Sequence, residues 1–125
     1  MAQRPSTEAY HSGSGNVGVL FVHGFTGSPA SLRDWAEATA AAGYRVALPR
    51  LPGHGTRWQE LAVTSWQDWY ACVDRELTDL AASCDKVFVA SLSMGGALSL
   101  MLAQRRPDDV AGLLLVNPAI AATSP

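Results

Sequence analysis

The stretch from Ser91 to Gly96 (SLSMGG) places serine hydroxyls, which are potential nucleophiles, among small residues. It follows Lys86 to Ala90 (KVFVA), an apolar run with the composition of a buried strand, and it precedes a nearly all-apolar helical segment. A serine at such a strand-to-helix turn is held in a strained conformation, and the helix N-terminus behind it offers free N–H groups to a developing oxyanion. The pattern predicts that Ser93 is a nucleophile.

Two further motifs lie upstream of this turn. His23 to Pro29 (HGFTGSP) closes the apolar run Val17 to Val22, and Leu51 to Gly55 (LPGHG) lies in a loop rich in proline and glycine. With the serine turn, in this order, they resemble the α/β-hydrolase family, and most closely its small carboxylesterases, monoacylglycerol lipases and serine-aminopeptidase-like members. The resemblance extends from about Val17 to Asn117.

This resemblance implies a serine hydrolase that cleaves carboxylic esters through an acyl-enzyme, with a small acyl ester as substrate. Ser93 would attack the ester carbonyl, and the backbone N–H groups of Phe25 and Met94 would form the oxyanion hole. Acyl transfer or peptide hydrolysis on the same elbow is one alternative, and a truncated, non-catalytic remnant is another. No cofactor is expected.

The sequence departs from the family pattern in two ways. The family's elbow is G-x-S-x-G, whereas Ser91 stands here in the place of the first glycine. No histidine follows His54, and the only acids after Ser93 are Asp108 and Asp109. We therefore expect the catalytic acid and histidine beyond residue 125, and we expect the chain to be the N-terminal part of a longer gene product.

The three histidines and the two cysteines of the chain are expected to be structural or inert. His23 belongs to the loop after the first strand, His54 lies in the PGHG loop, and His11 is expected to be exposed. Three scattered histidines without paired cysteines make a metal site improbable. Cys72 and Cys84 are separated by a helical interval of about 18 Å, so we expect free thiols.

The elements that must position Ser93 follow from the hydrophobic pattern. Strands are expected at 17–22, 44–48, 86–90 and 112–116, and helices from Ser28–Pro29 to Gly43, from Ser65 to Ser83 and from Met94 to Arg105. This alternation predicts an α/β fold, a parallel sheet flanked by helices on both faces, of the incomplete α/β-hydrolase type. Residues 1–16 are expected to be a flexible leader, and residues 17–125 the N-terminal portion of the domain.

The resemblance also implies the arrangement of these elements. The second strand would lie outside the first and the third on its other side. Right-handed crossovers would then place the first helix on one face and the later two on the other.

Composition restricts the classes of function. With 48% hydrophobic and 16% charged residues, the 125-residue chain should fold, and a net charge of −2 without a basic run argues against nucleic-acid binding. No segment resembles a signal peptide or a membrane span, so a cytoplasmic protein is expected. The last predicted strand, Gly112 to Val116, would be an exposed apolar edge that invites self-association.

Overall fold

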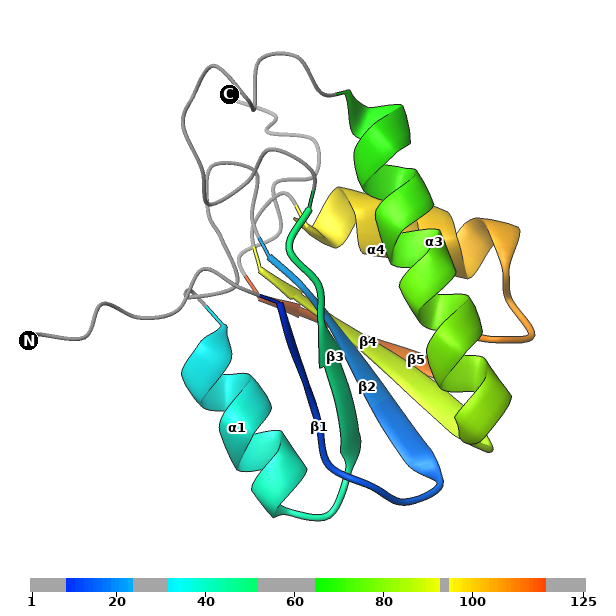
Figure 1. The fold of residues 1–125 in the computed structure, drawn as a ribbon. Coiled ribbons are helices and arrows are strands. Elements are labelled where there is room, and N and C mark those ends of the chain that lie inside the picture. Colours follow the sequence, from blue (N-terminus) through cyan, green and yellow to red (C-terminus); the bar gives the residue numbers. More distant parts are fainter. Residues whose placement is uncertain (1–8, 24–31, 52–64, 93–94, 117–125) are drawn as a thin grey trace, which may run out of the picture.

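The computed structural model describes residues 9–23, 32–51, 65–92 and 95–116. The elements in chain order are β1 (Tyr10–Ser12), β2 (Val17–Val22), α1 (Arg33–Ala41), β3 (Arg45–Leu48), α3 (Trp66–Ser83), β4 (Lys86–Leu92), α4 (Gly95–Arg105) and β5 (Gly112–Val116). The strands form one sheet in the order β1-β3-β2-β4-β5, in which only β1 runs antiparallel to its neighbour (Figure 1).

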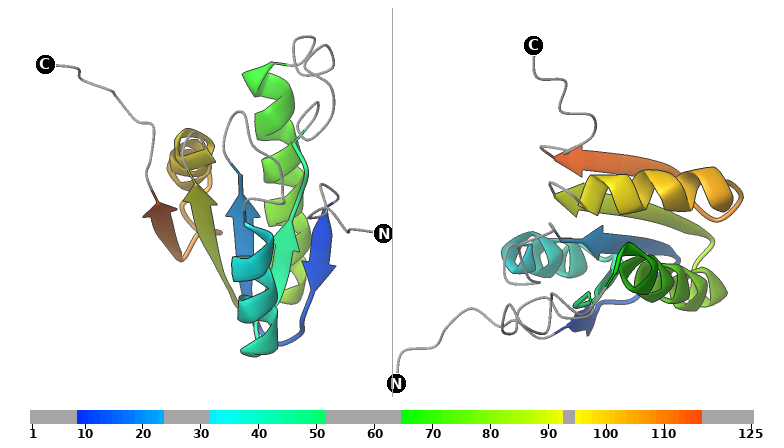
Figure 2. Two further views of the ribbon diagram at one scale, coloured as in Figure 1. Left: turned by 90° about the vertical axis from the view of Figure 1, so that its left-hand side faces the viewer. Right: turned by 90° about the horizontal axis from the view of Figure 1, so that it is seen from above.

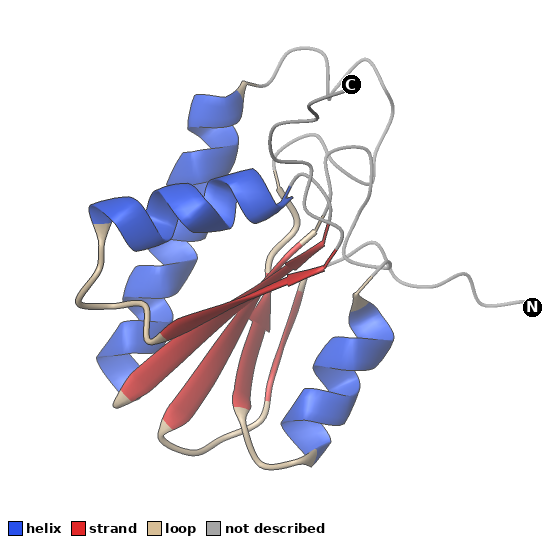
Figure 3. Cartoon of the chain, turned by 180° about the vertical axis from the view of Figure 1, so that it is seen from behind, coloured by secondary structure: helices blue, strands red, loops and turns tan. Residues whose placement is uncertain are grey.

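The sheet is covered on both faces, as the sequence predicted. Helix α1 packs on one face, and α3 and α4 pack together on the other, which Figures 2 and 3 show from different sides. Alternation along β2 explains why its whole run is apolar. Leu20 and Val22 belong to the cluster under α3 and α4, whereas Val19 and Phe21 belong to the cluster under α1.

Helix α3 begins where local sequence chemistry predicts. The Ser65 hydroxyl accepts a hydrogen bond from the Asp68 backbone N–H, and the Asp68 carboxylate accepts one from the Ser65 backbone N–H at 3.0 Å. This reciprocal capping box satisfies two N–H groups that the first helical turn leaves free. The helix then buries Trp69, Val73 and Leu77 at helical spacing against the sheet.

Arg106, just after α4, ties this helix to α3. Its guanidinium donates to the backbone carbonyl of Asp74 at 2.9 Å and to the Thr78 hydroxyl at 2.8 Å, and it pairs with the carboxylates of Asp74 and Asp109. Partial burial lowers the pKa of this guanidinium, but the bonds and charges of Asp109 and Asp74 outweigh burial and raise it. Asp109 therefore serves the scaffold, in the turn before β5.

The structure differs from expectation at the N-terminus. Tyr10 to Ser12, inside the segment predicted to be a flexible leader, form β1 and pair with β3. His11, predicted to be exposed and inert, keeps a largely exposed ring but pairs with Glu76 of α3 at 2.5 Å. On the other face of β1, the Arg33 guanidinium lies 4.1 Å from the centroid of the Tyr10 ring. These contacts with two helices hold a short edge strand that its own sequence does not predict.

Other differences concern element boundaries. The predicted opening of the first helix at Ser28–Pro29 lies outside the described residues, and α1 is described from Arg33. Strand β4 continues two residues past Ala90, to Leu92, because Ser91 and Leu92 still pair with β5. Both cysteines are free thiols, as expected. Within the described ranges, no helix combines the length and the apolar character needed to cross a membrane.

Candidate active site

The carboxyl ends of β2 and β4 meet at one edge of the sheet. The two strands are parallel neighbours, and Val22 is paired with Ser91. The carboxyl ends of the two strands therefore lie side by side. Ligand sites of open α/β sheets lie outside this carboxyl edge. The three predicted site residues, Phe25, Ser93 and Met94, follow these two strands but lie outside the described residues.

Only two residues, Ser93 and Met94, separate β4 from α4. The close approach of α4 to the end of β2 explains why glycine follows them. A Cβ at Gly95 would lie 2.7 Å from the carbonyl oxygen of His23 and closer still to that of Val22. Within the helix, the buried Ser99 hydroxyl donates to the Gly95 carbonyl at 2.9 Å. Strand, short connection and tightly packed helix are the surroundings that a nucleophile elbow requires.

Ser91 occupies the position where the family pattern has glycine. Its side chain is 1% exposed, and its hydroxyl has no hydrogen-bond partner in the described part of the chain. A buried hydroxyl without a partner costs about 1–3 kcal/mol. The sequence identified Ser91 as a departure from the pattern, but only the packing around it shows this cost.

His23 has a structural role, in agreement with the interpretation of the sequence. The ring is fully buried, and its Nε2 atom accepts a hydrogen bond from the backbone N–H of Leu51 at 3.0 Å. This bond joins the residue after β2 to the segment after β3, so it fixes two neighbouring strand ends relative to each other. The Nε2 lone pair is thereby engaged and does not serve as a general base. His54 lies outside the described residues.

The thiol of Cys72, a buried residue of α3, has a raised pKa. Burial, and next the negative charge of Glu76, raise the pKa of the Cys72 thiol, while Arg75 acts in the opposite direction. The thiol lies 3.9 Å from the carbonyl oxygen of Arg50. A raised pKa keeps the group as a neutral thiol, which suits core packing rather than nucleophilic catalysis.

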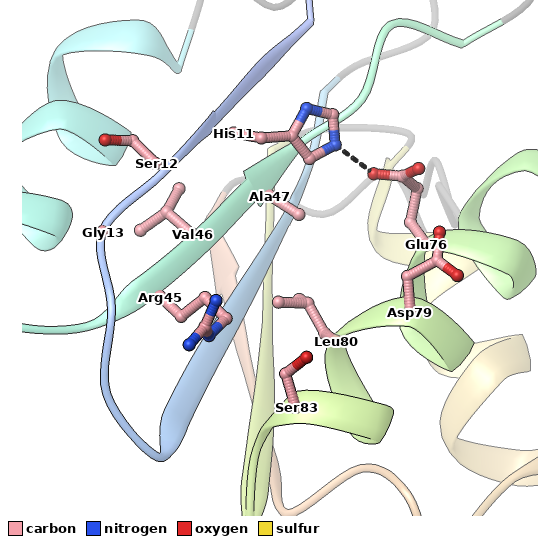
Figure 4. A pocket seen from close by; sticks show the side chains of 10 residues that line it. All are labelled: His11, Ser12, Gly13, Arg45, Val46, Ala47, Glu76, Asp79, Leu80 and Ser83. Atoms are coloured by element: carbon pink, nitrogen blue, oxygen red, sulfur yellow. Dashed lines mark hydrogen bonds and ion pairs between the residues drawn. The ribbon is translucent and has the colours of Figure 1, made fainter.

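A groove of about 310 Å³ lies on the flank of the sheet, between the β1–β3 edge and α3 (Figure 4). Ala47 and Leu80 contribute apolar surface, and the paired side chains of His11 and Glu76 face each other across it. It is not at the edge where Ser93 follows β4. No group of three histidine, cysteine or acidic residues that could hold a metal ion occurs among the described residues.

Comparison with known proteins agrees with this geometry. Residues 19–125 match the Alpha/beta hydrolase family. A thermostable monoacylglycerol lipase of Bacillus sp. (strain H-257) is 48% identical over 113 residues, which cover 90% of this chain and 45% of the relative. A carboxylesterase of Bacillus subtilis (strain 168) is 33% identical over 94 residues, 74% of this chain and 38% of the relative. The chain thus spans less than half the length of these two relatives.

Solved structures show the same fold. A solved structure from work on LipS and LipT, two metagenome-derived lipolytic enzymes, superposes on this chain with a TM-score of 0.91 at 45% identity. The match covers 97% of this chain and 49% of that protein. A Paleococcus ferrophilus monoacylglycerol lipase gives a TM-score of 0.74 at 25% identity, over 94% of this chain and 46% of its own.

Proposed function

This chain belongs to the alpha/beta hydrolase family, and we propose that it carries the nucleophile and oxyanion hole of a carboxylic ester hydrolase. The supporting observation is that only two residues join β4 to α4, and that Gly95, the first residue of α4, packs against the carbonyls of Val22 and His23. A strand end joined by only two residues to a helix packed this closely is the setting that a nucleophile elbow requires. Two of the relatives, a monoacylglycerol lipase and a carboxylesterase, support the same chemistry.

In the proposed reaction, the Ser93 hydroxyl oxygen bonds to the ester carbonyl carbon and gives its proton to a base. The carbonyl becomes an oxyanion that the backbone N–H groups of Phe25 and Met94 stabilise, each contributing about 3–4 kcal/mol. Collapse expels the alcohol, which takes up the proton, and leaves an acyl-enzyme. Water then attacks the acyl carbon and releases the acid and the free serine. No residue of this chain is assigned as the base or as the acid that orients it.

The substrate class is an acyl ester, with monoacylglycerols and short- or medium-chain esters as the first candidates. A cytoplasmic location is proposed with it. Peptide hydrolysis or acyl transfer on the same elbow is the alternative, and one relative is the acetyltransferase component of an acetoin cleaving system. The two lipase and esterase relatives cited above are the reason for placing ester hydrolysis first.

The test uses protein expressed from the complete gene. Hydrolysis of a monoacylglycerol, a short-chain nitrophenyl ester and a peptide anilide is compared for the wild type, Ser93→Ala and Ser91→Ala. We expect ester turnover in the wild type and in Ser91→Ala, and a loss of at least about a thousandfold in Ser93→Ala. Ester turnover unchanged in Ser93→Ala contradicts the proposal, and turnover of the anilide alone favours the peptidase.

A further inference from the structure

The carboxyl end of β2 lies between two parallel neighbours in the sheet, β3 on one side and β4 on the other (Figure 1). The ladder with β4 continues to the last residue of β2, Val22, which is paired with Ser91. The ladder with β3 already ends at the pair of Leu20 and Ala47. In the described part of the chain, sheet pairing with β3 therefore stops before the end of β2 is reached.

The side chain of His23 makes the connection that this ladder does not make. The ring is fully buried, and its Nε2 atom accepts a hydrogen bond from the backbone N–H of Leu51 at 3.0 Å. An imidazole nitrogen that accepts a hydrogen bond carries no proton, so the ring acts here as a neutral acceptor. Leu51 is the first residue of the LPGHG motif, and its side chain is buried in the cluster under α3 and α4. The bond therefore joins the end of β2 to a point that the core holds in place.

The backbone of His23 contacts α4, the helix that follows β4. A Cβ at Gly95 would lie 2.7 Å from the His23 carbonyl oxygen, so the helix approaches this carbonyl at a distance that only glycine permits. Phe25 lies two residues after His23, and Met94 immediately precedes Gly95. One residue thus contacts the segment after β3 through its ring and the helix after β4 through its carbonyl, next to both proposed oxyanion donors in the sequence.

We propose that His23 is a positioning residue for ester hydrolysis, which fixes the Phe25 and Met94 donors relative to each other through its ring and its carbonyl. This inference rests on the proposed function, because the donors are those of the ester hydrolase. The oxyanion forms only as the reaction proceeds, so a misplaced donor slows the chemical step more than it weakens substrate binding. The LPGHG motif gains a role at the site, since its first residue supplies the N–H group that holds the ring.

The test removes the acceptor at residue 23 with and without a replacement. His23→Phe keeps a planar ring of similar size but cannot accept a hydrogen bond from Leu51. In His23→Gln, the amide oxygen reaches the position of Nε2 and can accept that bond. His23→Asn is the matched control, because its shorter side chain places the amide oxygen near the position of Nδ1. The comparison of His23→Gln with His23→Asn decides the question even if His23→Phe does not fold.

Steady-state kinetics with a short-chain nitrophenyl ester are measured on protein expressed from the complete gene. We expect kcat to fall about a hundredfold in His23→Phe and His23→Asn, with KM changed less than about threefold, because a misplacement of about 1 Å costs such a factor. His23→Gln should keep kcat within about tenfold of the wild type. Arg106→Ala, which removes bonds between the end of α4 and α3, controls for lost stability and should keep the wild-type kcat.

Inhibition by an alkylboronic acid gives a second readout. This inhibitor bonds to a nucleophilic serine as a tetrahedral anion that resembles the transition state. Its inhibition constant should rise in step with the loss of kcat across the His23 variants, whereas a smaller folded fraction lowers kcat without changing the inhibition constant. An unchanged kcat in His23→Phe, a loss confined to KM, or equal kcat in His23→Gln and His23→Asn overturns the positioning role.

Ser93→Ala, measured in parallel, separates this result from failure of the proposed function. If Ser93→Ala loses turnover while His23→Phe keeps it, only the positioning role is overturned. A wild type without ester turnover, or one that Ser93→Ala equals, overturns both the proposed function and the role of His23.

Discussion

Replacing Gly95 with alanine tests whether the tight packing of α4 on the end of β2 shapes the connection that carries Ser93. The added Cβ would lie 2.7 Å from the His23 carbonyl oxygen and closer to that of Val22, whereas side-chain Cβ atoms practically never approach within 3.0 Å. Both obstacles are backbone carbonyls, one in the last residue of β2 and one in the residue after it, so they cannot rotate away as a side chain would. The helix must retreat by several tenths of an ångström, which loosens the packing of Leu98 and Leu102.

The expected cost follows from two opposing effects. Overpacking of this kind costs about 1–3 kcal/mol. Alanine is favoured over glycine inside a helix by about 1 kcal/mol, but Gly95 is the first residue of α4, where this gain is smaller. We expect a net loss of about 2 kcal/mol, which lowers the midpoint of urea unfolding by roughly 1 M. Circular dichroism at 222 nm follows this transition.

Gly18→Ala is the matched control for this substitution. A Cβ at Gly18 would lie 3.0 Å from the sulfur of Cys84 and 3.3 Å from a methyl of Leu80, and both are ends of side chains that can shift. We expect a loss below about 1 kcal/mol there, because flexible neighbours relieve overpacking more cheaply than backbone does. If Gly95→Ala is as stable as the wild type, or if both variants lose the same amount, the reasoning about the elbow packing is refuted.

Three further substitutions or labels test other parts of the structure. Ser91→Ala should raise the free energy of unfolding by about 1 kcal/mol, because the deleted hydroxyl is buried without a partner; a loss of stability in urea would show that the hydroxyl is bonded. Arg106→Ala should lower it by about 1–3 kcal/mol, because the bonds of its guanidinium to α3 and to Asp109 are lost. Glu37→Ala, which breaks a surface ion pair with Arg33 within α1 and leaves Arg33 beside Tyr10, should cost less than about 0.5 kcal/mol, and equal losses would contradict this difference. In the native protein, Cys72 should react with iodoacetamide more slowly than the less buried Cys84. The reaction rate of Cys72 should rise with pH, because its raised pKa limits the fraction of thiolate. Equal rates for the two cysteines, measured by peptide mass spectrometry, would contradict this prediction.

The parts of the fold set by local chemistry were predictable from the sequence. Ser65 and Asp68 form the capping box that their spacing indicates, and apolar periodicity identified the helices and the four parallel strands. The order of the three central strands came from the resemblance to the family and is confirmed. The faces covered by α1 and by the two later helices followed from the handedness of crossovers.

The parts that depend on contacts distant in sequence were not predictable. Strand β1 is three polar or aromatic residues long, and it is positioned by β3 and by contacts of Tyr10 and His11 with two helices. The pair of His11 and Glu76 joins residues 65 positions apart, and no local pattern signals it. The unpartnered hydroxyl of Ser91 is likewise a product of packing between sheet and helix. Phe25, Ser93 and Met94 as site residues stay a prediction.

Locating a covalent label tests the central claim, that Ser93 is the nucleophile, most directly. Protein expressed from the complete gene is treated with a fluorophosphonate, digested with trypsin and sequenced by tandem mass spectrometry. The peptide 87–105 contains Ser91, Ser93 and Ser99, so its fragment ions distinguish the three hydroxyls. We predict a single adduct on Ser93 that disappears in Ser93→Ala. An adduct on Ser91 or Ser99, or no adduct on this peptide, would contradict the claim.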